Sequence, residues 1–357
     1  MLILKPLSLG ILSRVAYLRR RHIFALGAVA PFRLDDPTRL TFEPAFWKAA
    51  APLLNGAILD QAMPKPQGEV LLLGTAHAPQ GQPVRVMDVG FRIGPITRRL
   101  RVFGNRHWVE ARGGIYPTEA APFTEMPVTA ARAFGGANYP ENPAGHGHGA
   151  AALLRAGAPA ALPNIEDADR PLREIGDAPP PVLTGPVDIA APSRRRMAGT
   201  YDSNYLRDWH PGLPPDADMR LFQAAQPNQW LQGFFSGEEE IILAGFRQNP
   251  EPWRSRLPGM RVRSFVQQRN AEGVISAHEI AMRIDTVWLL PDAGLGCLIY
   301  RGLHPVTDPD GKDIATVMMG YERLSDPPRA VEHYQEQLRL RTDEATKAHY
   351  LLRESPL

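Results

Sequence analysis

Hydrophobic and polar residues alternate along much of the chain, and this period of two is typical of β-strands. Between residues 83 and 111 the alternation is broken by turn signals at 94–95 and 104–105, which predicts an antiparallel meander of three strands. A change of phase at Met87 and Asp88 predicts a β-bulge in the first strand. The alternating positions of the second strand are Ile96, Arg98, Leu100 and Val102.

The second half of the chain repeats this pattern. Four further strands are predicted, and turn residues at 291–294 join the last two; the strands are residues 240–246, 260–269, 279–290 and 295–302. Near the N-terminus, two apolar runs flank Arg19–Arg21 and predict two strands joined by a basic turn. The same letters also resemble a twin-arginine signal with an A-x-A site at 28–30, although the apolar run is short for that purpose.

Helical periodicity is confined to two places. Residues 46–54 predict a short helix, and the tail from Pro327 onward predicts an amphipathic one capped by Asp326. The apolar stripe of the tail consists of Val331, Tyr334, Leu338, Ala345, Ala348 and Leu352. This helix packs either on the protein's own sheets, which the modest stripe favours, or on a partner.

These elements predict a mainly β protein with a minor α+β character. We expect two antiparallel β-sandwich-like subdomains joined by a loop-rich middle, with a helix at the C-terminal end. The boundaries are an N-terminal β-rich half at 1–140, a central region packed on both halves at 141–235, a C-terminal β-rich half at 236–325 and a helical tail at 326–357. The segment 102–149 is rich in Gly, Pro and aromatic residues, which predicts ordered loops.

Composition excludes several classes of protein. The 40 basic residues are nearly balanced by 38 acidic ones, and no long basic stripe with interleaved aromatics is present, so nucleic-acid binding is disfavoured. No run approaches the roughly 18 apolar residues of a membrane span. The single cysteine, Cys297, cannot form an internal disulfide, which favours a reducing, cytoplasmic location.

The search for catalytic chemistry yields little. His146 and His148 lie two residues apart, but no third ligand has matching spacing, and a Gly-rich turn explains them equally well. Glu238–Glu240 is typical of a solvated turn. Asp202, Asp216 and Asp218 are explained by turn caps or arginine partners. We therefore predict no catalytic, cofactor-binding or metal site, and leave open two alternatives: a β-sandwich hydrolase using acids of the central loops, and a carbohydrate-binding or structural module.

Eight irregular motifs occur in a distinctive order from residue 102 to residue 294. They are VFGNRHW, PFTEMPVTAARAFGG, NPAGHG, LPNIED, AGTYD, LPPDADMRLFQAAQPNQ, GEEEIIL and DTVWLLPDAG. Their succession resembles an uncharacterised-domain family of type VI secretion effector adaptors, or chaperones, encoded beside VgrG and toxin genes, and the resemblance covers about residues 1–340. It implies a non-enzymatic, cytoplasmic protein that binds a cognate effector toxin and assists its loading onto the VgrG spike, with or without a PAAR tip, and that has neither nucleic-acid nor membrane partners.

A surface that binds a protein client needs aromatic and arginine anchors on rigid loops. The candidates are Arg106, Trp108, Phe123, Arg132, Phe134, Arg194, Tyr201, Trp209 and Trp230. Each has a structural alternative: Trp108 and Phe134 can be loop-to-core contacts, which is the more common role of such residues. Arg106 can pair with Glu110 or with a buried carboxylate.

Overall fold

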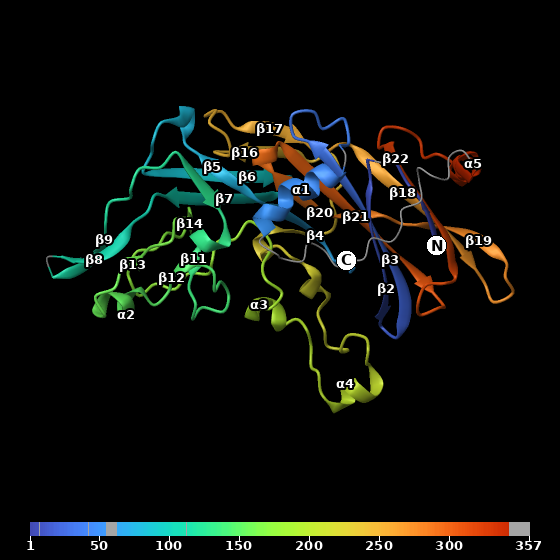
Figure 1. Ribbon diagram of the computed structural model, residues 1–357, viewed down its shortest axis with the longest axis horizontal. Coiled ribbons are helices and arrows are strands. Elements are labelled where there is room, and N and C mark those ends of the chain that lie inside the picture. Colours follow the sequence, from blue (N-terminus) through green and yellow to red (C-terminus); the bar gives the residue numbers. More distant parts are fainter. Residues whose placement is uncertain (7, 42, 55–62, 112, 343–357) are drawn as a thin grey trace.

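The computed structural model describes residues 1–6, 8–41, 43–54, 63–111 and 113–342, and it confirms the predicted mainly β class (Figure 1). The largest sheet has six strands, which are antiparallel except for the parallel pair β4 and β20. In spatial order they are β15 (Trp230–Leu231), β4 (Gly68–Leu72), β20 (Arg283–Leu290), β21 (Leu295–Val306), β3 (Arg21–Arg33) and β2 (Gly10–Leu18). The sheet therefore combines strands from both ends of the chain.

Two other large sheets also combine strands that are far apart in the chain. The five-stranded sheet is antiparallel throughout, in the order β14 (Ile165–Asp167), β7 (Ile96–Phe103), β6 (Val86–Ile93), β16 (Glu240–Ala244) and β17 (Trp253–Arg256). The four-stranded sheet has the order β1 (Leu2–Leu4), β22 (Ile314–Arg323), β18 (Met260–Arg269) and β19 (Ile275–Ile280). The expected β-rich halves at 1–140 and 236–325 thus do not form separate sheets, because pairing between distant strands, which local alternation does not encode, joins them.

Short strands make up the remaining sheets. They are β8 (His107–Ala111) with β9 (Gly114–Pro117) and β13 (Ala160–Ala161), β5 (Gly74–His77) with β10 (Glu125–Val128), and β11 (Phe134–Gly135) with β12 (His146–Gly147). The helices are α1 (Glu43–Leu54), α2 (Ala150–Arg155), α3 (Pro192–Arg195), α4 (Ser203–Asp208) and α5 (Val331–Thr342). None of the helices in the described part of the chain has the length and hydrophobicity needed to cross a bilayer.

A single main hydrophobic cluster draws on all three large sheets. It contains alternate residues of β3, β6 and β18, such as Phe32, Phe91 and Val266. The opposite face of the six-stranded sheet is covered by α1, whose Phe46 is fully buried, so the predicted helix at 46–54 is confirmed with an earlier start (Figure 1).

The predicted strands agree with the structure in most places. The N-terminal pair β2 and β3 is confirmed, with Arg19 and Arg20 at positive φ in the turn, and so is the pair β20 and β21. The predicted strand 279–290 is wrong as a single strand, since it spans the end of β19 and all of β20.

The meander prediction is correct only for its first hairpin, β6 and β7. The edge of β7 that a third strand would occupy is taken by β14, and β8 pairs with β9 and β13 instead. The predicted bulge is also wrong, because β6 and β7 keep one register throughout. Val86, which suggested it, is 47% exposed and belongs to the outer face of the strand.

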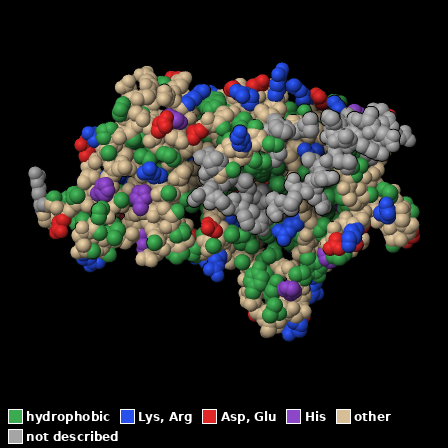
Figure 2. Space-filling model, viewed as in Figure 1, with side chains coloured by type: hydrophobic (Ala, Val, Ile, Leu, Met, Phe, Trp, Pro, Cys, Tyr) green, Lys and Arg blue, Asp and Glu red, His purple; other side chains and the backbone are tan. Residues whose placement is uncertain are grey.

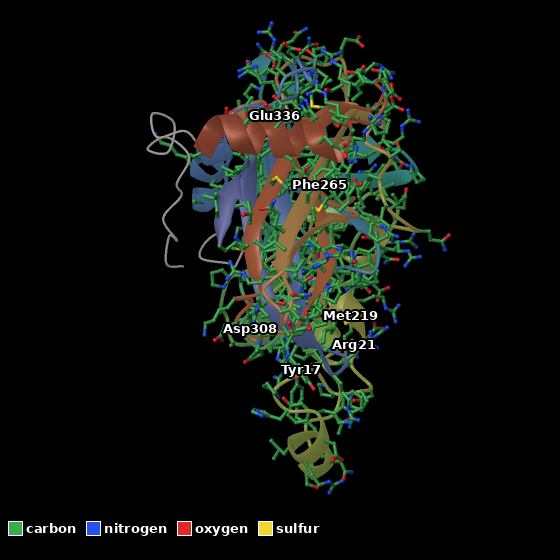
Figure 3. The ribbon with its side chains drawn as sticks, turned by 90° about the vertical axis from the view of Figure 1, so that its right-hand side faces the viewer. Tyr17, Arg21, Met219, Phe265, Asp308 and Glu336 are labelled. Atoms are coloured by element: carbon green, nitrogen blue, oxygen red, sulfur yellow. The ribbon has the colours of Figure 1, made fainter. Side chains whose placement is uncertain are left out.

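Helix α5 confirms a C-terminal helix packed on the protein's own sheet. The buried Tyr334 lies against Phe265 and Met318, and Figure 3 shows α5 lying across the strands near Phe265. The predicted start at Pro327 with Asp326 as cap is wrong, since the helix begins at Val331. The backbone that precedes the helix is held by two hydrogen bonds: Arg261 donates to the Asp326 carbonyl, and the Arg329 N–H donates to Glu322. Predicted stripe residues beyond 342 lie outside the described part of the chain.

Candidate binding pocket

Strand β7 places an arginine where its alternation calls for an apolar residue. Ile96, Leu100 and Val102 face the core, and Arg98 shares their phase. Arg98 is accordingly only 6% exposed. A charged group at such a position loses its hydration, which is costly unless a partner replaces the water.

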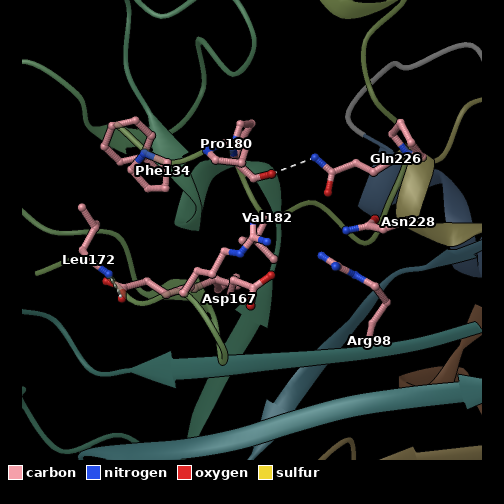
Figure 4. A pocket seen from close by; sticks show the side chains of 14 residues that line it. Arg98, Phe134, Asp167, Leu172, Pro180, Val182, Gln226 and Asn228 are labelled. Carbon is pink, nitrogen blue, oxygen red and sulfur yellow. Dashed lines mark hydrogen bonds between the residues drawn. The ribbon is translucent and has the colours of Figure 1, made fainter. Parts of the chain in front are cut away.

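Arg98 lines a cavity of about 290 Å³ (Figure 4). The opposite walls come from β14, from the segment 170–182 and from the turn at 226–228. Most of the lining is apolar and includes Phe134, Ile165, Leu172, Pro179, Pro180, Pro181 and Val182. The cavity is therefore a mainly apolar pocket whose wall also carries two arginines, Arg98 and Arg170, and two carboxylates, Glu166 and Asp167.

The Arg98 guanidinium has no hydrogen-bond or ion-pair partner among the described residues, and its buried Nε is unsatisfied. Burial lowers the pKa of Arg98, while the negative charge of Asp167 raises it in part. A guanidinium nevertheless remains protonated in proteins. In Figure 4 it points into the pocket between Asp167 and Asn228.

The wall beside Arg98 is held by a buried ion pair. Arg106 donates to Glu166, whose second oxygen accepts the Leu172 N–H at 2.9 Å. Burial lowers the pKa of Arg106 and raises that of Glu166, so the low-polarity surroundings disfavour both charges. The Arg106 guanidinium also lies 3.4 Å from the ring centroid of Phe103. The pair fixes β14 and the chain that follows it, whereas the buried Arg98 has no such carboxylate partner among the described residues.

The facing wall is fixed by an amide. Gln226 donates to the Pro181 carbonyl at 2.7 Å, drawn as a dashed line in Figure 4, and accepts the Leu183 N–H at 3.2 Å. Because both ends of this amide are engaged, the proline-rich segment 179–182 is tied to the turn at 226–228. The pocket is thus formed by interactions already made within the chain.

A second feature is an arm formed by residues 188–221, which projects from the body and carries α3 and α4 (Figures 1 and 2). At its base Arg194 donates to the carbonyls of Val187 and Leu221. Nearer the tip, Asp216 accepts hydrogen bonds from the backbone and hydroxyl of Thr200. The arm is therefore an ordered hairpin-like projection.

The tip of the arm exposes large apolar side chains. Tyr201 is 56% exposed and Leu206 66% exposed. Asp202 caps α4 by accepting the Tyr205 N–H, and the ring of Tyr201 packs edge-on against that of Tyr205. Arg20 of the β2–β3 turn lies 4.7 Å from the centroid of the Trp209 ring, which links the tip to the body.

The structure separates the predicted partner-binding residues into two groups. Arg106, Trp108 and Phe134 are buried, and Phe123, Arg132, Arg194 and Trp230 are partly buried. Arg132 donates to Asn164, and Trp230 donates to the Ala225 carbonyl. Tyr201 is exposed and Trp209 is partly buried, and both flank α4 in the arm. A role of any of them in partner binding stays a prediction.

The other candidate residues have internal partners. The prediction that Arg106 meets a buried carboxylate is confirmed by Glu166, and Asp202 and Asp218 cap short helices as expected. His146 contacts the carbonyls of Ala131 and Leu162. Within the described ranges, no cluster of three or more His, Cys, Asp or Glu side chains is arranged to hold a metal.

Glu239 accepts hydrogen bonds from three successive backbone N–H groups, at 236–238, as expected of a turn. Arg98 was not singled out in the sequence, although an arginine in the apolar phase of an alternating strand was the available signal.

The fold and the pocket define a β-rich protein with a mainly apolar pocket that contains a buried arginine, and with a projecting arm. A family model covers residues 15–301, and the chain belongs to that family, described as uncharacterised proteins conserved in bacteria (DUF2169). No curated protein and no solved structure matches the chain.

Proposed function

We propose that this protein is a non-enzymatic adaptor that binds a protein client through the arm. The observation that carries the proposal is the exposure of Tyr201 and Leu206 on a projection held by internal hydrogen bonds at its base and near its tip. Aromatic and arginine side chains are enriched at interfaces, and a preorganised surface loses little entropy on binding. Arg207, exposed beside Leu206 and paired with Asp208, adds a polar rim to the same surface.

The resemblance of the motif order supports the identity of the client. On that basis the client is a type VI secretion toxin, and the adaptor brings it to the VgrG spike, with or without a PAAR tip. The site of action is the cytoplasm, where the toxin is made. The protein contributes binding and solubility rather than chemistry.

Co-purification tests this proposal. The tagged protein is expressed with the toxin and spike proteins encoded beside it, and the eluate is analysed by mass spectrometry. We expect a stoichiometric toxin, and a client that is degraded or insoluble when expressed alone. Recovery of the protein alone, with a toxin that is soluble without it, would refute the adaptor role.

A matched pair of variants tests the arm itself. The double variant Tyr201→Ser/Leu206→Ser removes the exposed apolar tip, and Val274→Ser removes an equally exposed side chain, 61% accessible, from the β18–β19 turn. The first should weaken the complex by about tenfold or more and the second should leave it unchanged. Equal retention by both variants would show that the client binds elsewhere.

A further inference from the structure

We propose that the Arg98 pocket is a binding site for a monocarboxylate that carries a small apolar substituent. The site is independent of the arm and does not rest on the adaptor proposal. The carboxylate would pair with the Arg98 guanidinium, and the substituent would contact the apolar wall. The group can come from the C-terminal residue of a peptide or from a free organic acid.

The first argument is the state of Arg98. It is nine-tenths buried, points into the cavity and has no partner among the described residues, whereas nearby Arg106 is paired with Glu166. An unpaired buried cation is costly to the folded protein, and a bound anion removes that cost. A planar guanidinium fits a carboxylate through two parallel hydrogen bonds.

The second argument concerns the charge of the ligand. Asp167 lines the same pocket, and its field acts on Arg98. Glu166 and Arg170 line the pocket too, so two carboxylates offset its two arginines. A dianion such as phosphate would meet both carboxylates, so a single negative charge is the better match. The side-chain amide of Asn228, at the exposed rim, has no hydrogen-bond partner among the described residues and faces the space in front of Arg98 in Figure 4. It can donate to a carboxylate oxygen.

The third argument concerns the size and lining of the cavity. Its volume of about 290 Å³ is at the lower edge of the roughly 300–1,000 Å³ of typical ligand pockets. Phe134, Ile165, Pro180 and Val182 provide apolar contact surface. A group the size of one branched aliphatic residue matches this combination better than a nucleotide or a sugar, which brings many polar groups.

The test is calorimetric titration of the full-length protein with four probes: isovalerate, N-acetyl-leucine, N-acetyl-leucinamide and inorganic phosphate. The two carboxylates should bind, while the neutral amide, which has the same shape as N-acetyl-leucine, should not. Tighter binding of N-acetyl-leucine would assign a peptide terminus as the source, and tighter binding of isovalerate would assign a free acid.

Variants connect the binding to Arg98. Arg98→Met keeps the length and apolar stem of the side chain and should weaken carboxylate binding at least thirtyfold. Arg99→Met is the matched control, because Arg99 is the next residue on β7, is exposed and pairs with Asp169. Carboxylate binding by this variant should be unchanged. Asn228→Ala, at an exposed position, tests the same site if the Arg98 variant does not fold, and should weaken binding severalfold.

Three results would overturn the proposal: no carboxylate binding by the wild-type protein, carboxylate affinity that is the same in Arg98→Met, or phosphate binding as tight as that of the carboxylates.

Discussion

Replacing Arg106 by methionine removes the cation that neutralises Glu166 in the wall of the pocket. The two side chains are 9% and 4% exposed, so neither has water to take the place of its partner. In the variant Glu166 keeps the hydrogen bond from the Leu172 N–H. The substitution therefore leaves one buried carboxylate with half of its former contacts.

The expected cost is about 3–5 kcal/mol, the usual result of breaking a buried pair by removing one partner. Burial already raises the pKa of Glu166, and loss of Arg106 raises it further. A carboxyl whose pKa is raised in the folded state gains stability as pH falls through that pKa, because the folded state then binds more protons than the unfolded one. The defect should therefore be largest near pH 8 and smaller near pH 5.

Urea denaturation followed by circular dichroism measures these differences. The control is Arg99→Met, which breaks the exposed Arg99–Asp169 pair and should cost no more than about 1 kcal/mol. The double variant Arg106→Met/Glu166→Leu removes both charges and should recover most of the loss. A loss below about 1 kcal/mol at pH 8, or a double variant as unstable as the single one, would refute the reasoning.

Three further predictions follow from single contacts. Without ligand, Arg98→Met should leave stability unchanged or raise it by about 1 kcal/mol, since it removes an unpaired buried charge; a clear drop in melting temperature would contradict this. Tyr334→Phe removes the hydroxyl that donates to Glu322. Burial opposes ionisation of Glu322, but its hydrogen bonds together keep the pKa of its carboxyl below the usual value. The ionised carboxylate therefore stabilises the fold above about pH 4.5, and this stabilisation is lost as pH falls. In melting curves the variant should lose this stabilisation at a higher pH than the wild-type protein. Gly104→Ala places a Cβ in steric overlap with the Ala121 carbonyl oxygen and should destabilise the protein by more than about 2 kcal/mol. Gly176→Ala, which has open space around it, should change stability by no more than about 0.5 kcal/mol in the same denaturation assay.

Local elements could be predicted from the sequence because strand alternation and turn residues act over a few positions. The predicted bounds of strand β18 match the observed ones. The turn at Arg19–Arg20 was predicted at its observed position, between the strands β2 and β3 that it joins. The pairing of distant strands could not be predicted in this way. That β4 lies beside β20, and β16 beside β6, depends on contacts between residues far apart in the chain, which leave no period in the sequence.

The candidate binding residues show the same limit. Aromatic and arginine residues were chosen as partner anchors by type, but Trp108 lies in a small core cluster with Leu162, and Arg106 is paired with Glu166. Residue type does not distinguish an interface anchor from a core contact, because both use the same apolar surface. Arg98 was detectable because it departs from the pattern of its own strand.

The pocket and the arm both depend on the central region 141–235, which contributes few strands to the large sheets. The paired sheets give β7 a fixed position, and the central segments wrap around it and supply the proline-rich wall and the projection. Recognition residues are commonly carried on loops that a rigid scaffold positions. Arg98 belongs to the scaffold, while most of the pocket wall around it belongs to the central region. Substitutions in residues 170–182 can therefore alter which apolar group fits without moving the Arg98 guanidinium. The buried cation of the pocket is therefore supplied by β7, while most of the apolar wall and the charges of Glu166, Asp167 and Arg170 come from the central region.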